Sequence, residues 1–365
     1  MSGRHVAMGL FTRDAEPSVL ELHDLDALVR DGGVAKPIPL SKAPPFTVVP
    51  MAASEELEII VQLCVWCFAA LSPIAALAWL VWSRCSLLSV LFALVVAAAS
   101  TYPHPIRVCD PTRLSNPIRN MKAAAAFIRY FSFRMVVEDL ESLTKLEGAK
   151  LFAGVPHGLW PVGVALLGYC WWFLPFGLIR AGTASIVLRL PVWRQVTLWN
   201  GGIPVDRHSL WRALMKGDNC LVAADGIAGM FAAQAHPRKE VFLLRRRRGL
   251  VRLALQTGVP IVPFVCFHNT TIVKPLADPW GLLRRASRLL GVSIILPAGR
   301  FLTPLPFRKP VTVCIGKALE AQLPVAEPSD ELIDKVHAKL INELVGLYHR
   351  HRERCGFGGV ELAVV

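Results

Sequence analysis

A histidine between proline and glycine is the first residue whose setting suggests chemistry. His157 lies in GVPHGLWPVG, flanked by Pro156 and Gly158, just after the apolar run LFAG. A histidine in such a turn faces a substrate rather than the core. Its neutral imidazole near pH 7 takes a proton from an alcohol that attacks a thioester. Taken alone, an ordinary loop histidine is the simpler interpretation.

A second segment, GGIPVDRHS over residues 201–209, combines glycines with an acid and a base. Gly202 lets the backbone pass close to a ligand, and Arg207 offers planar donors to a phosphate or carboxylate. Asp206 either holds Arg207 in place or forms a surface pair with it. The segment is therefore a candidate substrate-binding block.

Two further segments carry charge after apolar runs. Asp225 and Gly226 follow CLVAA, where a strand end presents a carboxylate and backbone N–H groups to a site; an ordinary Asp-Gly turn is the alternative. Arg247 and Arg248 close a run of four arginines, which is a solvated face, a bilayer contact or a clamp for CoA phosphates. No cluster of residues has metal-ligand spacing, so we expect no metal.

These segments need a scaffold, and the pattern around them predicts an α/β sheet. Short apolar runs bounded by glycine and proline predict buried strands, and they alternate with helical stretches. Asn116–Leu140 resembles a basic amphipathic helix. The predicted strands are 149–154, 220–224, 260–267 and 311–315, and further helices are predicted at 248–257, capped by Gly258, and at 329–354.

Composition indicates a globular body tied to a membrane. The 365 residues carry a formal charge of +13, are 53% hydrophobic and have a mean hydropathy of +0.45. These values exclude disorder, a coiled coil and a highly soluble enzyme of ordinary type. The positive charge suits an anionic bilayer or a polyanionic substrate. The hydropathy argues against nucleic acid as a partner.

Two uncharged runs predict a membrane hairpin. Ile59–Trp82 contains 24 residues without a charge, and Cys85–Ser100 contains 16. As helices they would measure roughly 36 and 24 Å, so one long span plus a buried core helix is the alternative. Pro73 is expected to kink the first arm, and basic residues after the second arm place both ends in the cytosol. The expected divisions are a mobile cytosolic tail over 1–54, a transmembrane hairpin over 55–102, a globular domain over 103–358 and a C-terminal tail over 359–365.

Together, and in this order, the segments resemble the diacylglycerol acyltransferase type 2 family, within the wider glycerolipid acyltransferase superfamily. The likeness covers about residues 57–358. It is carried by Pro156–Gly158, by RRRRGLVRLALQTGVPIVPFVCF from Arg245, by RKPVTVCIGK from Arg308, and by the closing segment 336–358. The ordered set is specific, although each piece alone is weak.

The chain departs from the family pattern at several positions. Val155 replaces the usual histidine or glutamate before the proline, and Gly229 stands where the family has a glutamate. Asp225 stands where lysophosphatidate-type acyltransferases carry the glutamate of Glu-Gly-Thr, yet their aspartate five residues after the histidine is Val162 here. The chain therefore resembles a divergent member with features of both branches.

The resemblance implies a mixed sheet flanked by helices, joined to the N-terminal transmembrane helical hairpin. It implies direct transfer of an acyl group from acyl-CoA, a co-substrate rather than a cofactor, to diacylglycerol or a related lipid alcohol. His157 would be the base, Asp225 would orient it, and amides near Gly158 or Gly226 would stabilise the oxyanion. The other expected binding residues are Pro156, Gly202, Asp206, Arg207, Arg247 and Arg248.

Several alternatives stay open at this point. The acceptor is diacylglycerol or a lysophospholipid, or else the chain is a weakly catalytic scaffold on membranes or lipid droplets. The expected location is the endoplasmic reticulum membrane with the catalytic body in the cytosol. Lipid droplets, the plastid envelope and a homo-oligomer are not decided by the sequence.

Overall fold

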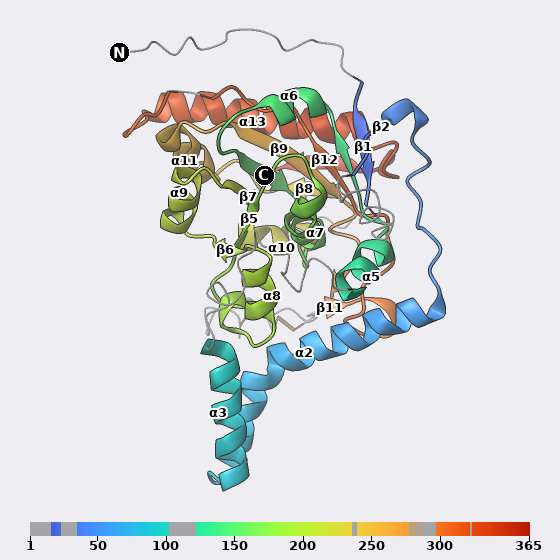
Figure 1. Ribbon diagram of the computed structural model, residues 1–365, viewed down its shortest axis with the longest axis vertical. Helices are drawn as coiled ribbons and strands as arrows, with labels where there is room; N and C mark the ends of the chain where they lie inside the picture. The colour runs from blue at the N-terminus through green and yellow to red at the C-terminus, as the bar shows by residue number, and fades with distance from the viewer. Residues whose placement is uncertain are drawn as a thin grey trace.

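The protein is built on a nine-stranded mixed sheet, seen in a computed structural model that describes residues 16–22, 35–101, 122–235, 239–276, 280–281, 285, 297–321 and 323–365. The strand order is β2-β1-β3-β12-β9-β4-β7-β5-β6 (Figure 1). β4, β9, β7, β5 and β6 run parallel, whereas β12 is antiparallel to β9. The strands are β1 Ser18–Glu21, β2 Ile38–Pro39, β3 Arg134–Val137, β4 Leu151–Val155, β5 Ile179–Thr183, β6 Ile203–Pro204, β7 Asn219–Ala223, β9 Ile261–Phe267 and β12 Thr312–Ile315.

Helices cover both faces of this sheet and form two hydrophobic cores. α7 (Val162–Cys170), α5 (Lys122–Tyr130) and the start of α2 pack on one face, while α9 (Arg207–Met215), α11 (Gly249–Thr257) and α13 (Asp330–His351) pack on the other (Figure 1). Side chains of β4 alternate between the two cores, as a strand with period two requires. Shorter helices are α6 Leu140–Lys145, α8 Trp193–Trp199 and α10 Gly226–Ala235, with 3-10 turns η1 Leu40–Lys42, η2 Trp171–Phe173, η3 Val187–Arg189 and η4 Arg300–Leu302.

The core strands and helices around the motifs agree with the sequence. The predicted strands correspond to β4, β7, β9 and β12, and the predicted helices to α11 and α13. Gly258 ends α11 in the left-handed conformation at φ 71°, as predicted for a helix cap. The expected mixed α/β sheet is confirmed.

The helix predicted over Asn116–Leu140 is wrong in its second half. α5 ends at Tyr130, Ser132 turns the chain at φ 45°, and β3 follows. Every residue of β3 is buried. A strand covered on both faces has no period-two alternation, so its pattern resembles that of a buried helix. Residues 102–121 lie outside the described part of the chain.

Both expected tails contain ordered structure. The prediction of a mobile tail over 1–54 is wrong for 16–22 and 35–52, because β1 pairs antiparallel with β3 and β2 extends the pairing. Val19 and Leu20 are fully buried by this contact. The tail predicted over 359–365 is also wrong. It forms β13 (Glu361–Val364), which pairs in parallel with β8 (Lys239–Phe242). The two strands make a separate small sheet, in which β13 supplies hydrogen-bond partners for one edge of β8.

The predicted hairpin is present as two packed helices, α2 (Ala53–Trp82) and α3 (Leu87–Thr101). The first part of α2 lies along the body, and its end projects from the body together with α3 (Figure 1). α2 bends by 48° between its segments Ala53–Ala69 and Leu71–Trp82. Pro73 explains the bend: it has no N–H for the carbonyl of Ala69, which instead accepts a hydrogen bond from Ser72 Oγ at 2.8 Å. The predicted kink is confirmed.

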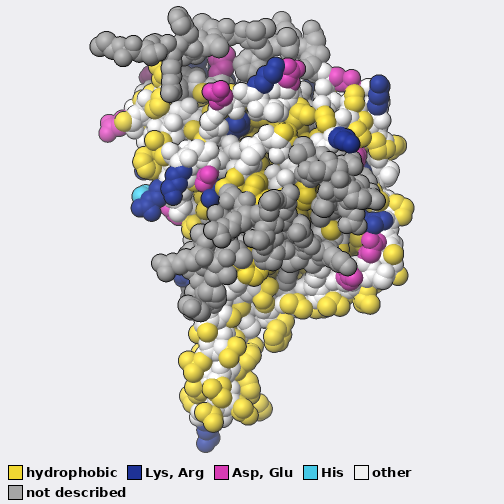
Figure 2. Space-filling view, viewed as in Figure 1, with side chains coloured by type: hydrophobic (Ala, Val, Ile, Leu, Met, Phe, Trp, Pro, Cys, Tyr) yellow, Lys and Arg dark blue, Asp and Glu magenta, His cyan; other side chains and the backbone are white. Residues whose placement is uncertain are grey.

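The outer part of the hairpin is almost entirely apolar on its surface (Figure 2). In the described residues, no single helix combines the length and hydropathy needed to cross a bilayer; the two bent segments of α2 meet that requirement only together. A membrane role for the hairpin therefore stays a prediction.

A small two-stranded sheet, β10 (Lys274–Pro275) with β11 (Pro297–Ala298), completes the described elements.

Candidate active site

Three neighbouring parallel strands bring the candidate residues to one edge of the sheet. β4 lies between β7 and β9, and all three end at the same edge. His157 follows β4, Asp225 follows β7 and Asn269 follows β9. Ligand sites in open α/β sheets lie at this carboxyl edge. The fold thus places two predicted residues and one unpredicted residue side by side.

Asp225 holds the backbone of His157. The N–H of His157 donates to both carboxylate oxygens, at 2.9 and 3.1 Å, and Asp225 is fully buried. The sequence predicted that Asp225 orients His157. The described contact reaches the peptide group and not the imidazole, so Asp225 acts on the position of the whole turn.

The imidazole of His157 makes its own contact, which fixes its tautomer. Nδ1 lies 2.8 Å from the carbonyl oxygen of Gly158. Since a carbonyl only accepts, we assign the proton to Nδ1, which leaves a lone pair on Nε2. Burial lowers the pKa of His157 below its ordinary value, and the contact with Gly158 opposes that shift. The ring is therefore neutral near pH 7, with Nε2 available as a base.

Two buried carboxyl groups lie close to this turn. Burial raises the pKa of Asp225 to about 7, against the opposing hydrogen bond from the N–H of His157. Burial likewise raises the pKa of Glu240, on β8, to about 7, and the charge of Asp225 adds to the rise. Thr270 Oγ1 donates to Glu240 at 2.9 Å. Glu240 was not predicted from the sequence, where its only signal is an acid within the apolar strand KEVF.

Asn269 is a second residue that the sequence did not reveal. Its side chain is fully buried, and Nδ2 donates to the carbonyl oxygens of Pro156 at 3.0 Å and His157 at 2.6 Å. Oδ1 accepts from the N–H of Gly163 at 2.9 Å. The available signal was the polar cluster HNTT directly after a buried strand, at the edge where sites form.

Two glycines leave the space that these contacts need. Gly158 has φ +65°, and a Cβ there would overlap the carbonyl oxygen of Asn269 and lie 2.9 Å from its carbon. A Cβ at Gly229 would overlap Oδ2 of Asp225. Gly226, at φ +57°, begins α10 beside Asp225 with open space where a Cβ would be. Pro156 follows a cis peptide bond with Val155.

The GGIPVDRHS segment joins the sheet as β6 and begins α9. Asp206 caps α9: its carboxylate accepts from the N–H of Ser209 at 2.9 Å and from Ser209 Oγ at 2.7 Å. Arg207 donates to Gln256 Oε1 at 2.8 Å. Gly202 packs against Thr197 in the last turn of α8, and its N–H donates to the carbonyl oxygen of Thr197 at 2.8 Å. Among the described contacts, none joins these three candidates to His157.

Two arginines of the run 245–248 interact with different parts of the molecule. Arg248 forms an ion pair with Asp334 of α13 at 3.0 Å. The positive charge of Arg247 lowers the pKa of Asp225. The C-terminal residue holds the start of the run, since the carbonyl oxygen of Val365 accepts from the N–H groups of Leu244 and Arg245 at 2.8 and 3.0 Å.

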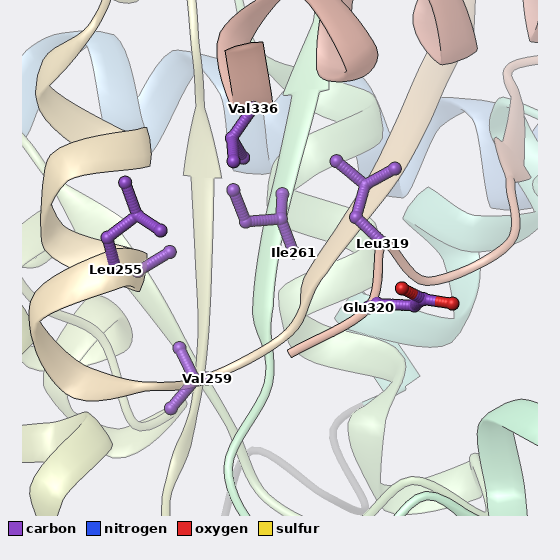
Figure 3. Close-up of a pocket in the computed structure, with 7 residues that line it drawn as sticks. Leu255, Val259, Ile261, Leu319, Glu320 and Val336 are labelled. Atoms are coloured by element: carbon purple, nitrogen blue, oxygen red, sulfur yellow. The ribbon is translucent and has the colours of Figure 1, made fainter. Parts of the chain in front are cut away.

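A small apolar hollow lies away from this site. Leu255, Val259, Ile261, Leu319 and Val336 line it, together with Ala254 and Glu320 (Figure 3). Ile261 is the first residue of β9 and pairs with Leu151, which lies roughly 13 Å along β4 from the end of that strand. The hollow is therefore at the opposite edge of the sheet. Within the described ranges, no group of three His, Cys, Asp or Glu side chains is arranged to hold a metal ion.

Comparison with known proteins relates the chain to lipid acyltransferases. Diacylglycerol O-acyltransferase 2-like protein 6 of Bos taurus is 28% identical over 276 residues, covering 69% of this chain and 80% of that protein. 2-acylglycerol O-acyltransferase 1 of Bos taurus is 26% identical over 263 residues, covering 67% and 76%. A solved structure, the 1-acyl-sn-glycerophosphate acyltransferase of Thermotoga maritima, aligns at 16% identity and a TM-score of 0.38, over 81% of this chain and 95% of that one. The sequence profile of the diacylglycerol acyltransferase family matches residues 80–364, which include the His157 turn and all three strands beside it. Since that match spans most of the chain at low identity to individual relatives, the chain belongs to the diacylglycerol acyltransferase family, as a divergent member.

Proposed function

We propose that the chain is a membrane-bound O-acyltransferase that moves a fatty acyl group from acyl-CoA to the free hydroxyl of diacylglycerol, giving triacylglycerol. The observation that carries the proposal is the neutral His157, with its proton on Nδ1 and an unprotonated Nε2, on a turn held by buried side chains. Family membership makes the chain an acyltransferase. Relatives named for diacylglycerol and 2-acylglycerol support a glyceride acceptor.

The proposed reaction is a direct transfer. Nε2 of His157 accepts the hydroxyl proton while the oxygen attacks the thioester carbonyl carbon. A carbon–oxygen bond forms, and the electron pair moves to the carbonyl oxygen, where backbone N–H groups near Gly158 or Gly226 stabilise it. Collapse of this intermediate breaks the carbon–sulfur bond. The proton then passes from His157 to the sulfur, which leaves as the CoA thiol.

The binding roles follow from charge and surface. Arg247, whose charge acts on Asp225, is the arginine we assign to the CoA phosphates, because Arg207 and Arg248 already bind Gln256 and Asp334. The hairpin would enter the bilayer of the endoplasmic reticulum and keep the body in the cytosol. Supporting this is its exposed apolar surface, formed by Phe68, Leu71, Ile74, Leu77, Val81, Trp82, Leu87, Leu88, Leu91, Leu94 and Val95.

The test is acceptor profiling with purified protein in lipid nanodiscs. Labelled oleoyl-CoA is offered with diacylglycerol, monoacylglycerol or lysophosphatidate, and the products are separated. We expect triacylglycerol, and a loss of about 100- to 10,000-fold in His157→Ala, the range for removing a general base. His349→Ala, an exposed histidine of α13, is the matched control. Products from lysophosphatidate alone would favour the phospholipid alternative, and a folded protein without transfer would favour a scaffold.

The pH profile should reveal Asp225. The pKa of Asp225 is raised to about 7, so lowering the pH through 7 protonates it and weakens its hold on the N–H of His157. We therefore expect kcat/KM to fall below pH 7. In Asp225→Asn the rate should be lower at neutral pH and lose this dependence, leaving only the protonation of His157, whose pKa is lowered and lies in a more acidic range. A wild-type profile that is flat around pH 7 would contradict this role.

Substitution of Arg247 should have two effects at once. In Arg247→Ala the KM for acyl-CoA is expected to rise about 10-fold, from loss of one charge-assisted hydrogen bond. Its charge also lowers the pKa of Asp225, so the acidic fall in rate should move to higher pH. Arg246→Ala, an exposed neighbour, is the control. Equal effects of the two substitutions would mean that the run acts only as a diffuse positive field.

A further inference from the structure

We infer that Asn269 is a positioning residue for the acyl transfer, holding the His157 turn from the side opposite Asp225. The inference rests on the proposed role of His157 as the base. Nothing in the sequence resemblance assigned a role to Asn269. Its side chain is fully buried: Nδ2 donates to the two carbonyl oxygens of the turn, and Oδ1 accepts from the N–H of Gly163 in α7.

The two side chains hold His157 from two different strands. Asp225, after β7, takes the N–H of His157, and Asn269, after β9, takes its carbonyl oxygen. β7 and β9 are the two neighbours of β4. Both polar backbone groups of His157 are thus held by buried side chains, so the turn is fixed to the sheet on both sides of the strand that carries it.

The orientation of the amide is set by its partners. The carbonyl oxygens of Pro156 and His157 only accept, so Nδ2 must face them, and the N–H of Gly163 only donates, so Oδ1 must face it. An aspartate of the same shape cannot donate two hydrogen bonds. It would place a carboxylate oxygen against two carbonyl oxygens in a buried site, which is strongly unfavourable.

Asn269 affects the chemistry by helping to keep the tautomer of His157. The ring of His157 keeps its proton on Nδ1 because the carbonyl oxygen of Gly158 lies 2.8 Å away. Gly158 also packs against the backbone of Asn269. If the His157 carbonyl is released, the Gly158 carbonyl moves relative to the ring, and Nε2 is no longer kept free and aimed. The loss should therefore appear in kcat and not in the KM for acyl-CoA.

The chain offers a matched control in Asn219. This second buried asparagine also donates two hydrogen bonds to carbonyls, of Phe176 and Leu178 at 2.8 and 3.2 Å, and accepts one from the N–H of Lys150 at 3.0 Å. It lies at the start of β7, at the opposite edge of the sheet. Asn219→Asp disturbs the fold in the same way as Asn269→Asp, but far from the His157 turn.

The experiment compares kcat, KM and Tm for wild type, Asn269→Asp, Asn219→Asp and His157→Ala in nanodiscs, at a temperature where all are folded. We expect similar falls in Tm for the two asparagine variants, a kcat about 100-fold lower in Asn269→Asp with KM for acyl-CoA within about twofold, and a kcat within about threefold of wild type in Asn219→Asp. If the aspartates prevent folding, the pair Asn269→Ser and Asn219→Ser replaces them.

The outcomes separate the two proposals. Equal losses of kcat in the two asparagine variants, or a wild-type kcat in Asn269→Asp while His157→Ala is inactive, would overturn the inference alone. An inactive wild type, or a His157→Ala protein as active as wild type, would overturn the proposed function, and the inference would fail with it.

Discussion

Replacing Gly158 by alanine should lower acyl transfer by about 1000-fold, as much as removing the positioned base itself. The new Cβ would overlap the carbonyl oxygen of Asn269 and lie 2.9 Å from its carbon. That neighbour is a backbone carbonyl in the turn directly after β9, held by the buried side chain of the same residue, so it cannot rotate away. The turn must move instead, and His157 moves with it. Measured at saturating acyl-CoA, the loss should appear in kcat.

Gly148→Ala separates this clash from backbone strain. Gly148 has φ +76°, close to the φ of +65° at Gly158, but a Cβ added at Gly148 would have no neighbour within 4 Å. Alanine there should cost about 1 kcal/mol of stability, the usual penalty for a left-handed residue with a side chain. Its activity should stay within about twofold of wild type. A Gly158→Ala protein that keeps more than a tenth of wild-type kcat would show that the turn tolerates displacement.

Strands and helices near the motifs could be predicted because their local signals agree with the fold. β9 is a continuous apolar run beginning just after Gly258 and Pro260, and α13 repeats leucines at helical spacing. β3 could not be predicted in this way, because burial on both faces removes the alternation that marks a strand. β1 and β13 were missed because short strands gain their stability from partners distant in the sequence.

In the candidate site, too, some residues could be predicted from the sequence and others could not. His157 and Asp225 were predicted because the ordered set of motifs resembles a family pattern; taken alone, each reads as an ordinary turn residue. Neighbouring parallel strands bring the two turns together. Asn269 and Glu240 were not found, because their roles depend on which backbone groups lie opposite them. Asp206 had a readable local signal: an aspartate three residues before Ser209 is a common helix cap, and capping is its observed contact.

Gly229→Ala should destabilise the protein, although replacing glycine by alanine in a helix interior normally raises the free energy of unfolding by about 1 kcal/mol. Gly229 lies in α10, and its Cβ would overlap Oδ2 of Asp225 and lie 2.5 Å from Cγ. Asp225 is fully buried, so its carboxylate must leave the N–H of His157 and lose both hydrogen bonds. We expect a loss of about 2–3 kcal/mol, typical of a buried polar group left without its partner. Thermal unfolding shows directly whether the substitution lowers or raises stability, and kcat should fall at least about 100-fold.

A double-mutant cycle then tests whether the two residues share one space. In Asp225→Ala/Gly229→Ala the clash is gone, so the second alanine should stabilise the helix by about 1 kcal/mol, as an ordinary substitution would, and the coupling energy should be about 3–4 kcal/mol. Activity should stay low, because the carboxylate that holds His157 is absent. Additive effects would contradict a shared space. The carboxylate of Asp225 lies four residues earlier in the chain, and the missing side chain at Gly229 is what allows it to reach the His157 turn.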